Sequence, residues 1–541
     1  MQYQHGAYFY AKEGEYVDEI LWHQNKKSFL DVCHGKYGRK VIYSNVPEVN
    51  AENVLRVMGN SMYIHNQNRR EIDYLYHYVS GDQPILYRVK DVRPEIKNDV
   101  VENHALEVVR FMTAQTYGEP IQYVSMKKSD NENENLSSEI DKLNDYMRSL
   151  DKEACDVEIG DWQSTCGTAY RETWSKPRDA LEPGEPAMGI DCVDPRNNFI
   201  VYSSRHGHKP LCSFSKCWDE KDQEYWLCTT PKRVFEIKSG KIVSDTANGH
   251  RRVLLVEYPN NVRRLSDVEV TITMTDAMNK IQSNRVDGVE QFVQAFVKFV
   301  NCEIDEDTFI KMCKIGALKV KTVNPSFPAD VSMVSAQLDQ QQTQTSKDDI
   351  YKNFLIIQGM PSREQNTGGD TGQAVYLRNG WDFAEQRAKI DEPITKRSEK
   401  EFLRIALNIL KTKNQISKDL NVSDIDIKIN RNNTDNMLVK SQALIYLLEK
   451  GIHPKIAIRT VGLWSDPEKV YLESKPYLDA KYKVLDDDLE TQGKKAELFV
   501  KFLNAGFSPE ESGERSGLGT VDASKNPSFQ KWSYDGENGE E

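Results

Sequence analysis

The residues most able to do chemistry are histidines and cysteines crowded into one short stretch. It contains His206, His208, Cys212, Cys217 and Cys228, which could offer a zinc ion two imidazole nitrogens and two thiolates. Their spacing matches neither the C-x₂-C pair nor the H-x₃₋₅-H pair of structural zinc sites. The sequence therefore favours core thiols and surface histidines, with a metal site as the alternative.

Acidic clusters and nucleophile motifs are the next places where catalysis could reside. Asp486-Asp487-Asp488 and Asp219-Glu220 could bind Mg²⁺ as in a nuclease, but runs of charge are usually solvated faces or helix starts. No G-x-x-x-x-G-K-[ST] phosphate loop occurs in the sequence. In Gly513-Glu-Arg-Ser516-Gly517 the serine is displaced from its place in a G-x-S-x-G elbow. We therefore predict no catalytic residue, no cofactor and no enzymatic activity.

Aromatic side chains at Tyr74, Tyr76 and Tyr78, with His77 among them, could stack on nucleic-acid bases. They lie in a segment whose apolar residues recur at helical spacing. Packing in a core or an interface is therefore the favoured interpretation.

Composition limits the classes of protein that remain. The 541 residues carry 83 acids against 71 bases, a net charge of −12, which excludes a strongly cationic nucleic-acid coat. No run of 18 uncharged apolar residues occurs, and the first residues lack the pattern of a secretory signal, so we expect an intracellular protein without a membrane partner. Nine scattered cysteines indicate free thiols in a reducing compartment.

The first half of the chain mixes helices and strands. Apolar spacing predicts helices near residues 72–79, 105–114 and 136–150. From about Val157 to Tyr258 short β-prone runs alternate with Pro, Gly and Asn, and Ser239-Gly240 predicts a hairpin turn. This part of the chain is expected to be rich in sheet.

A long helix is predicted to begin at Ser266. From there to Val297 the apolar period is close to 3.6, and one helix of this length would span about 48 Å at 1.5 Å per residue. A small β-containing segment and a second helix, 340–361, follow. The apolar side chains expected to pack along the first helix are Met274, Met278, Ile281, Phe292 and Phe296.

The remainder is predicted to be a loop, a kinked helix, further helices and a tail. The segment 362–372 has three glycines and no aliphatic residue, so it reads as a loop. Pro393 should kink or divide the helical pattern of 373–411. Residues 425–429 alternate as a strand, and acid-rich 509–541 reads as disordered. The predicted class is α+β.

Several motifs, in this order, resemble the portal, or head-to-tail connector, proteins of tailed double-stranded DNA bacteriophages. The resembling subgroup is typical of long-tailed phages of Gram-positive hosts. Each motif is short, and their order and spacing over about residues 60 to 480 carry the resemblance. The motifs are Tyr78-Val-Ser-Gly-Asp-Gln83, Asn103, Tyr117-Gly-Glu-Pro-Ile121, Val256-Glu-Tyr-Pro-Asn-Asn261, Ser266-Asp267, Glu269, Asp276-Ala-Met-Asn279, Ser283, Thr371-Gly-Gln-Ala-Val375, Gly380-Trp-Asp-Phe-Ala-Glu385, Arg431-Asn432, Lys440 and Asp466-Pro-Glu468.

The resemblance implies an α+β portal-type subunit with an α/β wing, long stem helices, a small β-containing clip, a kinked tunnel helix and a helical crown. The implied parts are a wing at 1–265 with a β-rich insertion at about 156–249, stem helices at 266–298 and 340–361, a clip at 299–339, a tunnel loop at 362–372, a long kinked helix at 373–411, a crown at 412–508 and a disordered acidic tail at 509–541.

The resemblance also implies partners and a place in the virion. The subunit would form a ring, usually of twelve copies, at one capsid vertex, after assembly in the host cytoplasm. Double-stranded DNA would pass through its channel during packaging and ejection without sequence-specific recognition. The clip would contact the terminase and later a head-completion or tail adaptor protein. The wing would contact the major capsid and scaffolding proteins.

A channel through which DNA passes must not bind it tightly, and a net negative charge suits this. Each DNA phosphate that a basic residue neutralises adds to the affinity and contributes about 0.9 to the slope of log affinity against log salt concentration. Any favourable contact must therefore come from local groups, and the loop candidates are Arg363, Gln365, Asn366 and Thr367. The bland alternative is a loop that only caps a helix. Alternative functions are another capsid or tail structural component, or a packaging enzyme or nuclease subunit.

Overall fold

The computed structural model describes an α+β chain that divides into two compact units, residues 1–432 and 433–541. We describe each unit by itself. None of the described helices is both long and apolar enough to cross a bilayer. The structure describes residues 29–33, 36–91, 93–126, 133–177, 181–182, 184–293, 296–303, 321–324, 326–328, 330–334, 340–362, 380–431, 437–464 and 467–519.

Helices form much of the first half of the first unit, as the apolar spacing predicts. The longest, α3 (Val54–Val79), buries Tyr74, Leu75 and Tyr78 and ends at Ser80-Gly81, where Gly81 takes a φ of 100° that favours glycine. The other helical elements are α2 (Phe29–Cys33), η2 (Pro84–Tyr87), α4 (His104–Tyr117), α5 (Asn133–Ser149) and α6 (Lys152–Cys166).

Helix α6 corrects the predicted β-rich insertion, which was expected to begin at about residue 156. Ile159, Trp162 and Cys166 are buried at a helical spacing, so this stretch is a core helix, and the strands begin only at Thr168.

A six-stranded sheet in the order β1-β5-β6-β7-β8-β9 packs one face against α3. Only β1 and β5 run parallel in it. The predicted hairpin is confirmed, because Ser239 and Gly240 join β8 to β9 with φ values of 51° and 71°. The strands are β1 (Ile42–Ser44), β5 (Asn198–Ser203), β6 (Pro210–Trp218), β7 (Glu224–Thr229), β8 (Arg233–Lys238) and β9 (Lys241–Ala247).

A second sheet, in the order β10-β3-β4, lies against helices α6 and α11. Its other face meets β5 of the larger sheet through Tyr170, Ile200 and Leu255. A two-stranded pair joins β2 to β15, which confirms the strand predicted near Ile425. The strands are β2 (Gln122–Ser125), β3 (Thr168–Ser175), β4 (Met188–Val193), β10 (Leu255–Pro259) and β15 (Ile425–Lys428), the last preceded by the short helix η4 (Val422–Asp424).

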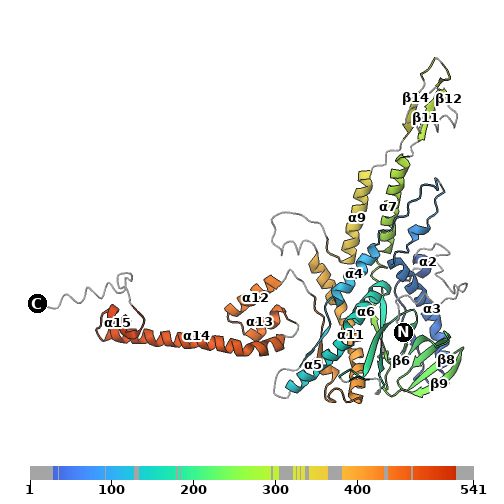
Figure 1. Ribbon diagram of the computed structural model, residues 1–541. Coiled ribbons are helices and arrows are strands. Elements are labelled where there is room, and N and C mark those ends of the chain that lie inside the picture. The colour runs from blue at the N-terminus through green and yellow to red at the C-terminus, as the bar shows by residue number, and fades with distance from the viewer. Residues whose placement is uncertain are drawn as a thin grey trace. The chain divides into compact units, whose positions relative to one another are not determined.

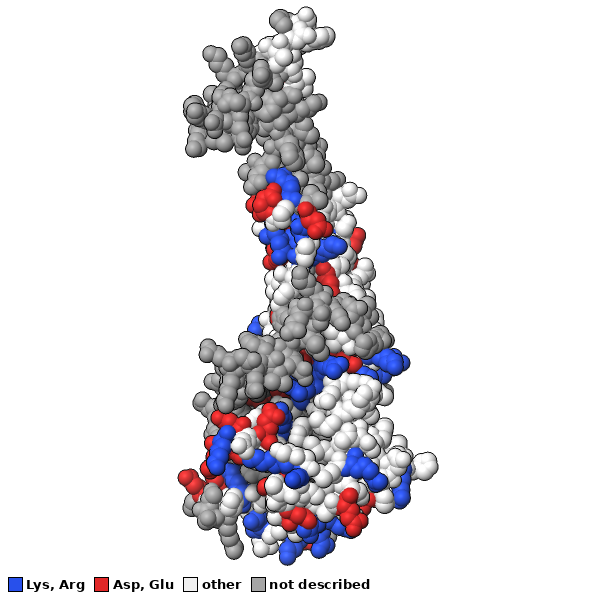
Figure 2. Space-filling model, turned by 90° about the vertical axis from the view of Figure 1, so that its right-hand side faces the viewer, with Lys and Arg blue, Asp and Glu red and all other residues white. Residues whose placement is uncertain are grey.

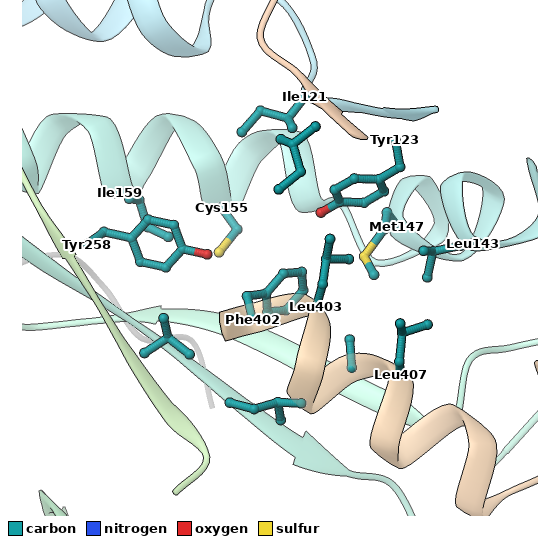
Figure 3. Packing of buried hydrophobic residues seen from close by; sticks show 14 of the residues in the cluster. Ile121, Tyr123, Leu143, Met147, Cys155, Ile159, Tyr258, Phe402, Leu403 and Leu407 are labelled. Carbon is teal, nitrogen blue, oxygen red and sulfur yellow. The ribbon is translucent and has the colours of Figure 1, made fainter. Parts of the chain in front are cut away.

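The main core lies where the C-terminal half of α11 (Trp381–Thr412) is surrounded by α5, α6 and strands (Figure 1). Figure 3 shows Phe402, Leu403 and Leu407 of this helix converging with Tyr123 and Tyr258 from two strands. Pro393 lies inside α11, which continues through it as one helix. Because α11 lies within this core, it is fixed along half of its length.

Two long helices project beside each other from the first unit and carry a small β tip (Figure 1). They are α7 (Ile272–Val293) and α9 (Gln340–Gln358), and together they form the stem hairpin. The tip holds β11 (Phe296–Val300) paired with β14 (Asp330–Val334), and β12 (Cys302–Glu303) paired with β13 (Lys321–Thr322).

The predicted first stem helix, 266–298, was too long at both ends. Residues 267–271 form turns, and Phe296 belongs to a strand, where it pairs with Val334. The segment Phe296-Val-Lys-Phe-Val300 is rich in β-prone residues, and the distant strand in which Val331 pairs with Phe299 provides the ladder that helix periodicity could not anticipate.

The second unit is helical and contains α12 (Met437–Glu449), α13 (Pro454–Val461), α14 (Pro467–Asn504) and α15 (Pro509–Ser516). Helix α15 corrects the prediction that the tail is disordered from residue 509. Ser508 caps it through a bond from Glu511 N to its Oγ (3.3 Å), and Pro509 occupies the first turn. Residues 520–541 lie outside the described part.

Candidate functional site

The predicted loop candidates Arg363, Gln365, Asn366 and Thr367 lie outside the described residues. The two ends of their segment are described and lie together. A Cβ placed on Gly380 would lie 3.9 Å from Cα of Pro361. The residues that flank the segment therefore lie side by side, after the end of α9 and before the start of α11.

Of the residues predicted to pack along α7, two lie at its lower half. Met278 is fully buried and Met274 is partly buried in a cluster with Phe354 of α9 and Met112 of α4. Ile281 is partly exposed. The side chain of Phe292 lies outside the described residues, and Phe296 is in β11 rather than on the helix.

Polar residues of the first motifs meet at the base of the stem. Gln83, which is fully buried, donates through Nε2 to Asn103 Oδ1 (3.1 Å) and accepts from the amide of Asn279 on α7. Tyr78 donates its hydroxyl to Asp276 Oδ1 (2.8 Å). Residues from separate sequence motifs thus form one hydrogen-bonded network that attaches α7 to α3 and α4.

Asp267 is a second joint, in the turns before α7. Its Oδ1 accepts from Arg387 Nη2 of α11 (2.6 Å), and its Oδ2 accepts from Ser164 Oγ of α6 (2.8 Å). Its carbonyl oxygen accepts from Gln358 Nε2 at the end of α9 (2.7 Å). One buried residue therefore ties both stem helices to the tunnel-helix candidate α11.

A strap, defined as residues 88–91 and 93–102, lies along α7. Asp287 of α7, nearly fully buried, accepts from Arg88 Nη2 (2.7 Å), Lys90 Nζ (3.0 Å) and the Asn98 backbone N (2.8 Å). Burial raises the pKa of Asp287, but these donors outweigh it and hold the pKa below its usual range. The strap therefore fixes the stem above its base.

A buried group of charges anchors the other half of α11. Glu399 accepts from Lys152 Nζ (2.8 Å), Arg171 Nη1 (3.1 Å) and Tyr258 OH (2.7 Å). Burial alone would raise the pKa of Glu399, but Lys152 and Arg171 lower it to about 2. Asp156, paired with both cations, balances the second positive charge. The four groups are neutral together, which makes their burial tolerable.

Four large apolar side chains remain exposed where α9 ends beside α11. We call them the exposed apolar set, and they are Ile356, Ile357, Phe383 and Ile390, with Phe383 71% and Ile390 73% exposed. The two helices adjoin here, since a Cβ on Gly359 would lie 3.2 Å from Arg387 Cδ. Single exposed apolar residues are ordinary, but four of them on two adjoining helices suit contact with another molecule.

The five weak metal candidates do not converge. Cys212 and Cys228 are fully buried in the core of the six-stranded sheet, whereas His206 lies exposed in the β5–β6 turn. Among the described residues no group of three or more His, Cys, Asp or Glu side chains could hold a metal ion.

Two other sites considered from the sequence are the Mg²⁺ candidate at Asp219 and the tyrosines that could stack on bases. Asp219 accepts from Lys238 Nζ (2.5 Å) and two backbone amides, and the Lys238 bond contributes most to lowering its pKa to about 2. The side chains of 486–488 lie outside the description. Tyr74 stacks on Tyr78 inside the core, and Tyr76 stacks on Trp162, which confirms packing over base stacking.

Sequence reasoning missed Asp287, Gln358, Arg387 and Glu399 as joint residues. Glu399 lies three and four positions before Phe402 and Leu403, on the apolar face of α11, and a charge at that spacing was an available signal for a buried ion pair. Asp287 offered none, because its partners lie 189 or more positions away.

The chain was compared with known proteins. Among solved structures it is similar to a chain from the virion of a native gene transfer agent particle, at 10% identity and a TM-score of 0.39, covering 67% of this chain and 90% of that one. A chain from the neck of a native particle computed with C12 symmetry covers the same shares at 10% identity and a TM-score of 0.38. No curated protein matches the sequence.

A match to a protein family extends over most of the chain. Residues 59–480 match the family described as "Phage portal protein, SPP1 Gp6-like". This match covers more than half of the 541 residues and includes both stem helices, α11 and the networks at the stem base. The chain therefore belongs to the family of phage portal proteins.

Proposed function

We propose that this chain is the subunit of a closed ring of twelve copies that forms the portal at one capsid vertex of a tailed double-stranded DNA phage. The observation that carries the proposal is the stem hairpin, which two joints fix at its base and the strap fixes above it, and whose base adjoins the exposed apolar set of α9 and α11. A rigid projecting hairpin with uncovered apolar residues buries them most simply against copies of itself around an axis.

The parts of the subunit follow from this proposal. The wing is the first unit up to about residue 265, α7 and α9 are the stem helices, and the β tip between them is the clip. Residues 362–372 are the tunnel loop, α11 is the tunnel helix, and the second unit belongs to the crown. Family membership and the agreement of these elements with the expected order support the assignment.

The proposed role is a channel for DNA packaging and ejection in the virion, without hydrolysis by the portal itself. Arg363, Gln365, Asn366 and Thr367 would line the channel and touch the DNA backbone. The clip would dock the terminase and then a head-completion or tail adaptor protein, and the wing would meet capsid and scaffolding proteins. Assembly in the cytoplasm of a Gram-positive host, and a long-tailed phage, complete the proposal.

Negative-stain electron microscopy of the purified full chain tests the ring. We expect closed rings with an axial hole and a constant subunit number. Compact monomers would point to the packaging-enzyme alternative, and shells or tubes would point to another capsid or tail component. Either result would overturn the proposal.

A further inference from the structure

The turn between β5 and β6 gathers basic side chains within five consecutive positions. In Arg205-His206-Gly207-His208-Lys209 every residue except the glycine is basic, and all five are exposed. His208 N donates to Arg205 O (3.1 Å), and Ser203 N donates to Lys209 O (2.9 Å). Gly207 and His208 take φ values of 88° and 41°. The turn is therefore tight and ordered, and it projects from the sheet.

The charges of this turn have no partner within the described residues. The side chains of Arg205, His206 and Lys209 make no hydrogen bond or ion pair there. Two exposed cations at the edge of the same sheet are paired, Lys232 with Glu48 (2.8 Å) and Arg233 with Asp245 (2.5 Å). Figure 2, a view of one face, shows acidic and basic residues interspersed over body and stem. The turn departs from that pattern.

A half-exposed aromatic pair supports the turn from the neighbouring strand. The ring of His208 lies 5.1 Å from that of Tyr43 in β1, and Tyr43 is 47% exposed. His208 Nδ1 lies 3.0 Å from the carbonyl oxygen of Ser203 and must therefore carry the hydrogen, since a carbonyl only accepts.

We propose that this turn is a binding surface for the phosphodiester backbone of double-stranded DNA, separate from the loop expected to line the channel. Arg205 offers a planar fork that fits phosphate oxygens, and Lys209 adds a point charge. Contacts of these two side chains with phosphates would not depend on the base sequence. The choice of DNA as the ligand rests on the proposed portal function. In a chain with a net charge of −12, attraction must come from such local groups.

The test compares the full-length chain with the double variant Arg205→Ala/Lys209→Ala. Binding of a 30-base-pair duplex is measured by fluorescence anisotropy at several salt concentrations and with two unrelated sequences. Loss of two phosphate contacts should reduce the slope of log affinity against log salt by up to about 2, equally for both sequences. An unchanged slope and affinity would overturn the inference.

The control variant is Lys142→Ala/Lys418→Ala, which removes two exposed cations that have acidic sequence neighbours at Asp141 and Asp419. It should bind DNA like the unaltered chain. Polyglutamate is used as a competitor, and displacement at equal charge concentration would show a surface for acidic polymers in general, contrary to the proposal. Microscopy of the same samples separates the two ideas. If both proteins form intact rings and the double variant binds DNA like the unaltered chain, only the DNA-binding role of the turn is refuted. If the unaltered chain forms no rings, the proposed portal ring is refuted.

Discussion

Asp276 makes the attachment of the stem depend on pH. It lies at the start of α7, accepts from Tyr78 OH, and burial raises its pKa to about 6 against an ordinary 3.8. The folded state thus binds this proton more tightly than the unfolded state. The associated stability is fully present below about pH 4 and is lost as the pH rises through about 6.

Replacing Asp276 by Asn should stabilise the protein at neutral and alkaline pH. The amide oxygen still accepts from Tyr78, and no buried charge remains. We expect the free energy of unfolding at pH 8 to rise by up to about 3 kcal/mol, with the gain shrinking toward pH 4. Urea unfolding at several pH values measures this. A gain independent of pH would mean that the carboxylate is not the titrating group.

Glu399 should behave in the opposite way, since its pKa is lowered to about 2. Its contribution is present above the ordinary pKa of a glutamate and is lost as the pH falls toward 2. Glu399→Gln leaves Lys152 and Arg171 buried with Asp156 alone, which should lower the free energy of unfolding at pH 7 by about 3–5 kcal/mol. The matched control is Glu401→Gln on the exposed side of the same helix, which should change it by less than about 0.5 kcal/mol.

At the scale of elements, the strap is the feature that holds α7 above its base. Asp287→Ala removes the acceptor shared by Arg88, Lys90 and Asn98 and leaves two cations half-buried. We expect amide exchange of residues 93–102 to quicken by tenfold or more, while exchange in the main core around Phe402 is unchanged. The control is Asp349→Ala, at an exposed position of α9, which should leave the amide exchange of residues 93–102 unchanged. Equal exchange in both variants would show that Asp287 does not hold the strap.

At the scale of the whole molecule, the exposed apolar set separates folding from assembly. Ile390→Asp changes a side chain that is 73% exposed, so the thermal midpoint of the subunit should barely move. If Ile390 lies between subunits of the proposed ring, a buried unpaired charge there should abolish rings in electron micrographs. Val262→Asp, at a 79% exposed position elsewhere, should leave rings intact. Normal rings from the Ile390 variant would remove this face from the interface.

The channel assignment is tested separately from assembly. Deleting Gly368 to Thr371 shortens the segment between α9 and α11, whose ends lie together, so the fold of both helices should survive. Rings should form in normal number, but genome filling of particles assembled with this variant should fall. Full heads at the usual frequency would contradict a channel role for the loop.

The sequence by itself determined the α+β class, most helices and the portal resemblance. These depend on local patterns, such as the helical spacing that places Tyr74, Leu75 and Tyr78 on one face of α3, or Ser239-Gly240 in a hairpin turn. The wrong predictions also came from local patterns. The helical period of α7 was extended through Phe296, which lies in a strand. The acidic residues at 509–516 were interpreted as disorder, although Ser508 caps a helix there.

Only the tertiary structure decided what the polar motif residues do. The bond between Gln83 and Asn279 spans 196 positions, and the bond between Arg171 and Glu399 spans 228. A hydrogen bond or buried ion pair requires its two atoms within about 3 Å, and no periodicity along the chain encodes which distant segment supplies the second atom. The motifs were therefore visible as a family pattern, while their shared purpose of fixing the stem to the body became clear only in three dimensions.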